Sequence, residues 1–424
     1  MSVSNFFLYI CSFIFIYNIP FTHSPLSGSK LMIIFMIFWL TMRGKHFVIK
    51  KPVLKPVYWM IVLLLYSLGS VFLQHTGDFG LVYAEVLFLL NHVLGCLLLI
   101  NIFQNCGKAT IYDILHMMVV IAFVQSVIII LSMLIAPFND FISSIAFIEG
   151  RDDLQFRYGY ARGYGLAASV TYDLAVCQAF AIMFIPYLMD KTLQKKKKIF
   201  YVLATFPILF SILTLGRTGL VGVGLALIFI VKDNAKISSK TIKISLYLFA
   251  TAMIGAAFLL GNDSLLIKSI NTYVFEGVDK IFTIGKLQTE TGGHLVNMLK
   301  GIKEWSSKTW IWGDARYSDD WRYYGHTDIG FMRDILYFGL IGAFILFIVY
   351  VHIYKIIQKK TEDRRFHFLM KLFFIFLLVA HFKGEFLLSC GTGICILLMI
   401  AFSVIFEDSE ATFSEDIYIR DPFI

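Results

Sequence analysis

The chain contains few charged residues, and it lacks the motifs of common soluble nucleotide and zinc enzymes. Only 16% of its 424 residues are charged, whereas soluble domains contain about 25%. The sequence has no Walker motif, no glycine-rich dinucleotide signature and no His-Glu-x-x-His motif. A soluble enzyme built around those motifs is therefore excluded, and we predict neither a metal site nor a cofactor.

Cysteine is also scarce. The six cysteines have neither the spacing of zinc ligands nor the pattern of a disulfide scaffold. Most of them fall inside apolar runs, so we interpret them as small buried hydrophobic residues. They are Cys11, Cys96, Cys106, Cys177, Cys390 and Cys395.

Apolar residues dominate the chain. Hydrophobic residues make up 58% of the sequence, 42 residues are phenylalanine, and the mean hydropathy is +0.75. A helix needs roughly 20 apolar residues to cross a bilayer. The sequence therefore predicts an all-α polytopic membrane protein with about twelve transmembrane helices. The predicted spans are residues 3–19, 27–42, 57–73, 81–100, 113–136, 163–189, 199–215, 217–231, 243–261, 327–353, 366–382 and 386–406. The first run lacks the basic start and the cleavage site of a signal peptide, which predicts a retained helix.

Connections rich in lysine and arginine alternate with connections that have few basic residues. Four connections carry clusters of basic residues, and these are 43–56, 190–198, 232–243 and 354–367. The positive-inside rule assigns them, and both termini, to the cytoplasm. The connections that alternate with them have almost no basic residues and are predicted to lie outside, and these are 20–29, 74–80 and 381–385. The net charge of +8 is then explained by the topology and by contact with the headgroups of the lipid bilayer, which is the predicted partner. Because the lysines are dispersed over short turns, we predict no nucleic-acid partner.

Two segments are too long to be simple turns, and both are predicted to lie on the outer side. Residues 1–261 form nine helices with a smaller outer loop at 137–162, and residues 262–326 form a large outer loop. Residues 327–406 form three more helices, and residues 407–424 form a cytoplasmic tail. The large loop is rich in tryptophan and tyrosine, which argues for a folded segment.

Within the large loop, apolar residues recur at helical spacing. They are Leu295, Met298, Leu299, Ile302 and Trp305, and they predict an amphipathic helix that lies on the membrane surface or over the bundle.

Two arginines stand at predicted outer boundaries of helices. Arg162 lies in Ala161-Arg-Gly-Tyr-Gly-Leu166, and Arg217 lies between two spans that have almost no loop between them. An arginine at the centre of a membrane helix costs about 2.5–3.5 kcal/mol on insertion scales, so one near the boundary needs a partner or a watery cavity. The alternatives are an interfacial arginine that reaches the headgroups, for Arg162, and a surface turn, for Arg217.

A histidine and two acids open the tenth predicted span. His326 titrates near neutrality and is a candidate general base for an acceptor hydroxyl. Asp328 is a second candidate catalytic residue, although a carboxylate in a first helical turn is also favoured by the helix dipole. Arg333, which is a further candidate substrate-binding residue, and Asp334 follow. The helical spacing predicts that these groups converge near the outer boundary. Alternatively, Arg333 and Asp334 neutralise each other or pair with other spans.

Further arginines and a histidine are predicted to contact an anionic substrate from the outer loops, although each is also an ordinary loop residue. They are Arg151, Arg157, Arg316, Arg322 and His294. A last set of polar residues lines a cavity or forms a polar seam between helices, and it comprises Glu85, Asn91, Asp173, His381, Lys383 and Glu385. The fixed fork of arginine suits paired phosphate oxygens without a metal ion, which favours a substrate that bears a diphosphate.

Four features together resemble a known family. They are Arg162-Gly-Tyr-Gly165, the Leu-Gly-Arg217-Thr-Gly-Leu junction, the large loop with its Trp-Ile-Trp-Gly313 turn, and the segment from His326-Thr-Asp328 to Gly342. In this order and spacing, the chain resembles the bacterial O-antigen and capsule repeat-unit polymerases of the Wzy type, in the superfamily that includes O-antigen ligases. Many relatives place an arginine before the amphipathic helix, where this chain has Gly293-His294.

The resemblance implies a metal-independent glycosyltransferase of the bacterial inner membrane whose active site faces the periplasm. Its substrates would be undecaprenyl-diphosphate-linked oligosaccharide repeat units, and a chain-length regulator protein would be a further partner. Carried over to this sequence, Arg162 and Arg217 would hold the diphosphate and His326 would activate or orient the acceptor. His294, Arg316 or Arg322 would take the place of the missing loop arginine. Aromatic residues such as Trp310, Trp312, Trp321, Tyr323 and Tyr324 contact the glycan or pack within the loop.

Two other functions remain open from the sequence. An O-antigen ligase uses the same donor but transfers the glycan to the lipid A core. A lipid-linked oligosaccharide flippase is also a bundle of many helices, although a transporter has little need of the folded loop at 262–326.

Overall fold

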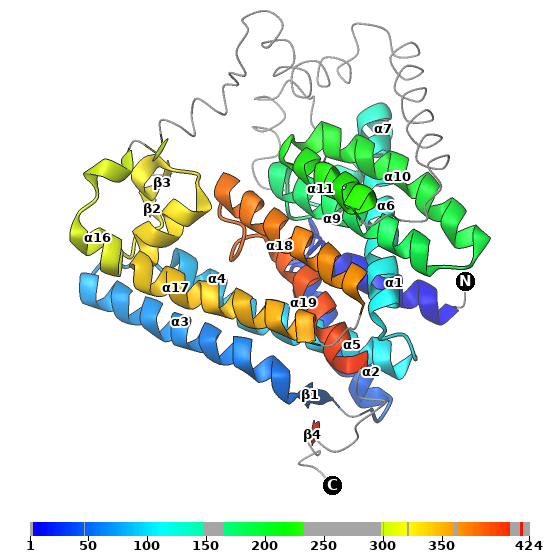
Figure 1. Ribbon diagram of the computed structural model, residues 1–424, viewed down its shortest axis with the longest axis horizontal. Helices are drawn as coiled ribbons and strands as arrows, with labels where there is room; N and C mark the ends of the chain where they lie inside the picture. The colour runs from blue at the N-terminus through cyan, green and yellow to red at the C-terminus, as the bar shows by residue number, and fades with distance from the viewer. Residues whose placement is uncertain are drawn as a thin grey trace, which may run out of the picture.

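The computed structural model describes residues 3–45, 47–147, 164–232, 298–299, 301–319, 322–359, 363–407 and 416–418. Within these ranges, seven helices are long and apolar enough to cross the core of a bilayer. The protein is therefore an all-α membrane protein, and Figure 1 shows its helices packed as one bundle.

The long helices are α3 (Leu54–Gln74), the continuous run of α4 (Gly80–Leu87), the π-helix η2 (Phe88–Val93) and α5 (Leu94–Asn105), α6 (Ile111–Leu134), α9 (Thr171–Lys191), α10 (Lys195–Leu215), α17 (Gly330–Lys359) and α18 (Arg364–Lys383). The shorter helices are α1 (Val3–Ile16), α2 (Gly28–Met42), α7 (Ala136–Ile145), α11 (Thr218–Lys232), α16 (Ser307–Trp312) and α19 (Gly391–Glu407). Three short 3₁₀ turns are η1 (Lys51–Val53), η4 (Gly301–Glu304) and η5 (Tyr324–His326).

Local signals set several helix starts. The Thr110 side chain accepts a hydrogen bond from the backbone N–H of Asp113 before α6, and Asp363 accepts from Arg365 and Phe366 before α18. Ser306 caps α16 in the same way, and Gly313 ends that helix with φ 73°.

The core surrounds α9. Every residue from 174 to 188 in this helix is buried, and α9 packs against α6, α10, α11, α18 and α19. A helix that is apolar on all sides is stable only inside other helices. This central position leaves the first turn of α9 at the junction of several helix ends.

Helix α17 is broken at Gly339, where φ is 66° and ψ is −177°. The break leaves carbonyl groups of the first half without partners in the helix. The backbone N–H groups of Asp314 and Ala315 donate to the carbonyl oxygens of Leu336 (2.6 Å) and Tyr337 (3.1 Å). The Tyr66 hydroxyl donates to the carbonyl oxygen of Phe338 at 2.8 Å. The loop that follows α16 is thus docked into the break.

We call the end of the bundle where α3 ends and α17 begins the capped end, because residues 306–319 and 322–329 cover it. Figure 1 shows α16 and the short antiparallel pair of β2 (Ser318–Asp319) and β3 (Arg322–Tyr323) together there. The Asp78 side chain accepts hydrogen bonds from the backbone N–H groups of Tyr317 (2.6 Å) and Ser318 (3.0 Å). The Tyr337 hydroxyl donates to the Asp78 carbonyl oxygen at 2.7 Å.

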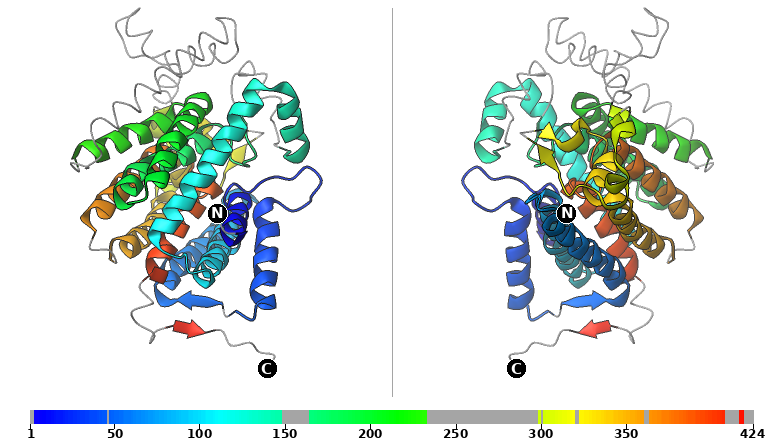
Figure 2. Two further views of the ribbon diagram at one scale, coloured as in Figure 1. Left: turned by 90° about the vertical axis from the view of Figure 1, so that its right-hand side faces the viewer. Right: turned by 90° about the vertical axis from the view of Figure 1, so that its left-hand side faces the viewer.

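A second antiparallel pair joins distant parts of the chain. Strand β1 (Val48–Lys50) pairs with β4 (Asp416–Tyr418), and Figure 2 shows this pair below the helices in both views. The predicted tail at 407–424 therefore returns to the basic connection at 43–56, as expected if both lie on the same side of the membrane.

Each predicted span overlaps an observed helix, except that 243–261 lies outside the described residues. Helices α7 and α16 lie in the segments that were predicted to be outer loops. Two predicted starts were wrong. Residues 164–170 are irregular, so α9 begins at Thr171 rather than at residue 163, and residues 384–390 are irregular before α19. The predicted span at 327–353 begins at Gly330 and is interrupted at Gly339. Most of the predicted amphipathic helix lies outside the described residues, although Met298–Leu299 are helical and η4 follows.

Candidate functional site

Arg151, Arg157, Arg162 and His294 lie outside the described residues. Arg322 is described only as a backbone position of β3. Gly165, which follows Arg162 by three residues, lies directly against α6, because a Cβ atom at this position would collide with the amide of Gln125. That glycine therefore permits the predicted close approach of another group.

The prediction that His326 and Asp328 converge with Arg333 along one helix was wrong. Helix α17 begins at Gly330, so neither residue belongs to it. His326 lies in η5 with a φ of 49°. Both side chains are exposed, as is that of Arg316, whose guanidinium carbon lies 5.9 Å from the ring centre of Tyr324.

Arg217 lies in the two-residue turn between α10 and α11 and is half-buried. The adjacent Gly216 packs against Tyr172, since a Cβ atom there would lie 3.5 Å from the Tyr172 Cα. A Cβ atom at Gly219 would meet the Ala175 carbonyl at 2.7 Å. The turn that carries Arg217 therefore lies against the first turn of α9, at the same end of the bundle as Asp173.

Arg333 is the predicted arginine that the structure places most deeply, with 6% of its surface exposed. Its guanidinium carbon lies 3.7 Å from the ring centre of Tyr323 and 4.3 Å from that of Tyr317. A guanidinium over an aromatic face is stabilised by about 0.5–2 kcal/mol. The two tyrosines belong to the segment that Asp78 holds, so the cap fixes the position of this arginine.

Asp334 pairs with a histidine of another helix. The His381 Nε2 atom on α18 lies 3.0 Å from the Asp334 Oδ2 atom. The other ring nitrogen, Nδ1, lies 3.2 Å from the backbone N–H of Phe386, which can only donate. His381 is therefore the neutral tautomer with its proton on Nε2. Both of its ring nitrogens are engaged, so this histidine positions Asp334 and the 384–390 segment and is not available as a base.

Two more carboxyl groups complete the site. Asp173 on α9 lies within electrostatic range of Glu385 and Arg333. The Oε1 atom of Glu385 accepts a hydrogen bond from the backbone N–H of Leu388 at 2.8 Å. The Tyr172 hydroxyl lies 3.5 Å from the Glu385 carbonyl oxygen. We call Asp173, Arg333, Asp334, His381 and Glu385 the polar cluster.

The polar cluster contains buried polar atoms that have no hydrogen-bond partner among the described residues. They are Arg333 Nε and Nη2, Asp173 Oδ1, Asp334 Oδ1 and Glu385 Oε2. Nε and Nη2 share one edge of the guanidinium, which is the edge that can hold two oxygens of one phosphate group. Buried polar groups are normally hydrogen-bonded, so this combination of donors and acceptors makes the cluster the candidate binding site.

Two groups of the site lie outside the membrane-spanning helices. Burial raises the pKa of Glu385, and the nearby Asp334 carboxylate raises it further, whereas the hydrogen bond from the backbone N–H of Leu388 opposes this shift. Burial also raises the pKa of the Tyr317 hydroxyl, which the Arg333 guanidinium only partly offsets. Glu385 therefore binds a proton more readily than an exposed glutamate does.

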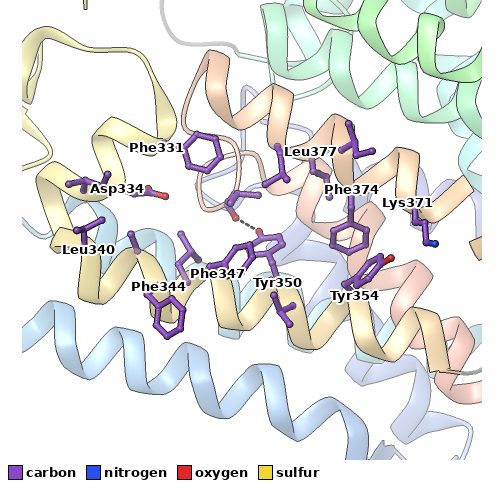
Figure 3. Close-up of a pocket in the computed structure, with 17 residues that line it drawn as sticks. Phe331, Asp334, Leu340, Phe344, Phe347, Tyr350, Tyr354, Lys371, Phe374 and Leu377 are labelled. Carbon is purple, nitrogen blue, oxygen red and sulfur yellow. Dashed lines mark hydrogen bonds between the residues drawn. The ribbon is translucent and has the colours of Figure 1, made fainter. Parts of the chain in front are cut away.

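An apolar groove of about 840 Å³ begins at the polar cluster and runs between α17 and α18 (Figure 3). Asp334 and Phe331 lie at one end of it. The Phe331 ring also packs edge-on against the His381 ring, with the two ring centres 4.4 Å apart. The groove continues past Phe344, Phe347 and Tyr350 to Tyr354 and Lys371, which line its far end. Asp334 is thus shared by a polar site and an apolar one.

Sequence reasoning identified some members of the polar cluster but not its organisation. Asp173, His381 and Glu385 were expected to line a cavity or a seam, and the structure brings them to one place. The contributions of Tyr317, Tyr323 and Asp78 were missed, because nothing in the spacing of loop residues indicates which side chain they contact. A weak signal for Asp78 was its position in a predicted outer connection at 74–80.

Comparison with models of known protein families and with curated proteins finds no match to this chain. Within the described ranges, no three His, Cys, Asp or Glu side chains are arranged to hold a metal ion.

Proposed function

We propose that the protein is a glycosyltransferase that polymerises undecaprenyl-diphosphate-linked oligosaccharide repeat units at the periplasmic face of a bacterial inner membrane. The capped end would face the periplasm. The observation that carries this proposal is the position of Arg333, which is buried, held by two tyrosines and adjacent in sequence to Asp334 at the start of an apolar groove.

This arrangement suits a substrate with a charged head and a long apolar tail. The free edge of Arg333 binds the diphosphate, and Arg217 beside the first turn of α9 adds a second positive charge at the border of the cluster. As the bond between the anomeric carbon and the diphosphate oxygen breaks, negative charge grows on that oxygen. A fixed guanidinium in a poorly hydrated site stabilises this charge.

The carboxyl groups serve the acceptor sugar. The oxygen of the acceptor hydroxyl forms the new bond to the anomeric carbon, and Glu385 accepts the proton of that hydroxyl. Undecaprenyl diphosphate leaves with the electron pair of the broken bond. The raised pKa of Glu385 favours this proton transfer. In this proposal, Glu385 takes the role that the sequence had suggested for His326, and Asp173 accepts a hydrogen bond from the same sugar.

The test uses purified protein with undecaprenyl-diphosphate-linked repeat units and gel analysis of the glycan ladder. We expect Arg333→Gln to slow polymerisation by about 10²–10³-fold, which is typical for the loss of one group that stabilises developing charge. Lys308→Gln is the matched control, because it removes the same charge from an exposed position of α16 and should leave the ladder unchanged. A chelator should have no effect on the wild-type protein. A normal ladder from Arg333→Gln would rule out this site.

The O-antigen ligase alternative is separated by the acceptor. Loss of a polymerase leaves surface glycan one repeat long, whereas loss of a ligase leaves no attached glycan. A gene deletion followed by analysis of the surface glycan therefore distinguishes the two.

One observation favours a transporter as a second candidate. Buried ionisable residues near membrane helix ends are typical of proton relays, and the polar cluster contains three carboxyl groups. A flippase would move lipid-linked oligosaccharide in liposomes without lengthening it, and the same purified protein can be tested for that movement.

A further inference from the structure

The groove between α17 and α18 has a composition that suits only an apolar occupant. It is lined mainly by aliphatic and aromatic side chains, with Asp334 and Lys371 as its charged residues. Figure 3 places these two residues at opposite ends, with Phe344, Phe347 and Tyr350 between them. A ligand in the groove would therefore lie along the helices, with any polar head beside the polar cluster.

The length of the groove distinguishes between lipids. Beyond the break at Gly339, its lining on α17 extends from Leu340 to Tyr354, which corresponds to about 21 Å at 1.5 Å per residue. One leaflet of a bilayer core is about 15 Å thick. An acyl chain of a phospholipid anchored at the capped end would stop near the midplane, whereas the groove continues into the opposite half of the bilayer.

Lys371 marks the far end. It is the eighth residue of α18, about 10 Å along the axis from the first residue, and its side chain is exposed. A lysine in this position extends its ammonium group toward the nearer interface and leaves its methylene groups along the apolar surface. The groove thus stays apolar until the level at which a lysine can reach water.

We propose that this groove binds the polyprenyl chain of the lipid diphosphate, with the diphosphate at Arg333 and the chain extending past Phe347 toward Lys371. This inference rests on the proposed function for the identity of the head, and on the length of the groove for the identity of the tail. The groove would thereby select a single long isoprenoid chain over the paired shorter chains of a phospholipid.

The experiment measures lipid binding by native mass spectrometry of the purified protein, with undecaprenyl diphosphate, farnesyl diphosphate and dioleoyl phosphatidylglycerol as probes. Ala343→Trp fills the groove, and Ile341→Trp is the matched control, since Ile341 is exposed and does not line the groove. We expect the wild type and Ile341→Trp to bind undecaprenyl diphosphate at least 10-fold more tightly than farnesyl diphosphate. Ala343→Trp should remove that difference.

Photo-crosslinking gives a second measurement that does not depend on the folding of a tryptophan variant. Benzoylphenylalanine at position 347 should form an adduct with undecaprenyl diphosphate, whereas the same group at position 341 should not. Equal binding of undecaprenyl diphosphate by Ala343→Trp and the wild type, or equal competition by dioleoyl phosphatidylglycerol, would overturn the proposal.

The two proposals fail in different ways. If the groove assignment is wrong but the protein is a polymerase, the glycan ladder forms and Ala343→Trp binds the lipid normally. If the protein is not a polymerase but the groove assignment is right, no ladder forms and the chain-length preference is still lost in Ala343→Trp.

Discussion

Arg333 is held in position by residues from two other segments of the chain. Tyr317 and Tyr323 hold its guanidinium, and they are in turn held by Asp78 from the connection between α3 and α4. The sequence predicted that Arg333 is a substrate-binding residue near a helix boundary. It could not predict the tyrosine contacts, because loop residues have no periodicity that assigns them a direction.

The raised pKa of Glu385 leads to a prediction at the same scale. A carboxyl group whose pKa is higher in the folded state contributes stability below its unfolded pKa, and this contribution is lost as the pH rises through the folded value. Glu385→Gln is always neutral. We therefore expect the melting temperature of Glu385→Gln to rise relative to that of the wild type as the pH increases above the unfolded glutamate pKa of about 4.3, measured by thermal unfolding in detergent. A pH-independent difference would contradict this prediction.

Asp363 provides a control of opposite sign. Burial alone would raise its pKa, but the Lys191 ammonium, 2.6 Å away, and the backbone N–H groups of Phe366 and Arg365 outweigh burial and lower it. Its contribution to stability is present above the unfolded pKa and is lost as the pH falls through the folded pKa. The loss of stability caused by Asp363→Asn, relative to the wild type, should therefore be largest near neutral pH and become smaller in acid.

At the scale of elements, the break in α17 decides how the cap is attached. Gly339 has a positive φ, and a Cβ atom there would collide with the Ile311 carbonyl group of α16. Hydropathy predicted one uninterrupted span here, because the residues on both sides of Gly339 are apolar. The break was not visible in that pattern, since it depends on the contact with a segment earlier in the chain.

We expect Gly339→Ala to lower the free energy of unfolding by at least about 2 kcal/mol, because the backbone strain and the collision add together. Gly224→Ala is the matched control. Gly224 lies within α11, and a Cβ atom there would meet nothing within 4 Å, so its effect should be neutral or stabilising by up to about 1 kcal/mol. Chemical or thermal unfolding of both variants in detergent measures the difference, and equal stabilities would refute the docking argument.

Other elements were predictable to different degrees. The basic connections and the long apolar runs predicted the helices well, since lipid contact imposes hydrophobicity over a fixed length. The starts of α9 and α19 were misplaced, because residues 164–170 and 384–390 are apolar enough to continue a helix yet lie at the capped end. These irregular segments surround the polar cluster, and hydropathy alone does not mark them.

For the whole molecule, the orientation in the membrane is the prediction on which the function depends. The capped end should face outward and the lysine-rich start of α10 inward. In a variant without native cysteines, Ser318→Cys should react with a membrane-impermeant maleimide in spheroplasts, whereas Lys196→Cys should react only after permeabilisation. Both side chains are exposed in the structure, so access to the reagent decides the result. Labelling of Lys196→Cys in intact spheroplasts would show that the orientation is the reverse of the predicted one, and the proposed periplasmic site would then be wrong.

The cap is attached mainly through its main chain. The amides of Asp314, Ala315, Tyr317 and Ser318 donate to the bundle, and the carbonyl oxygen of Gly313 accepts a hydrogen bond from Gln74 at 3.0 Å. Such bonds survive most exchanges of side chain. An evolving lineage could therefore replace the aromatic and polar groups on the outer surface of this segment, and so adapt to a different surface glycan, without rebuilding the scaffold beneath it.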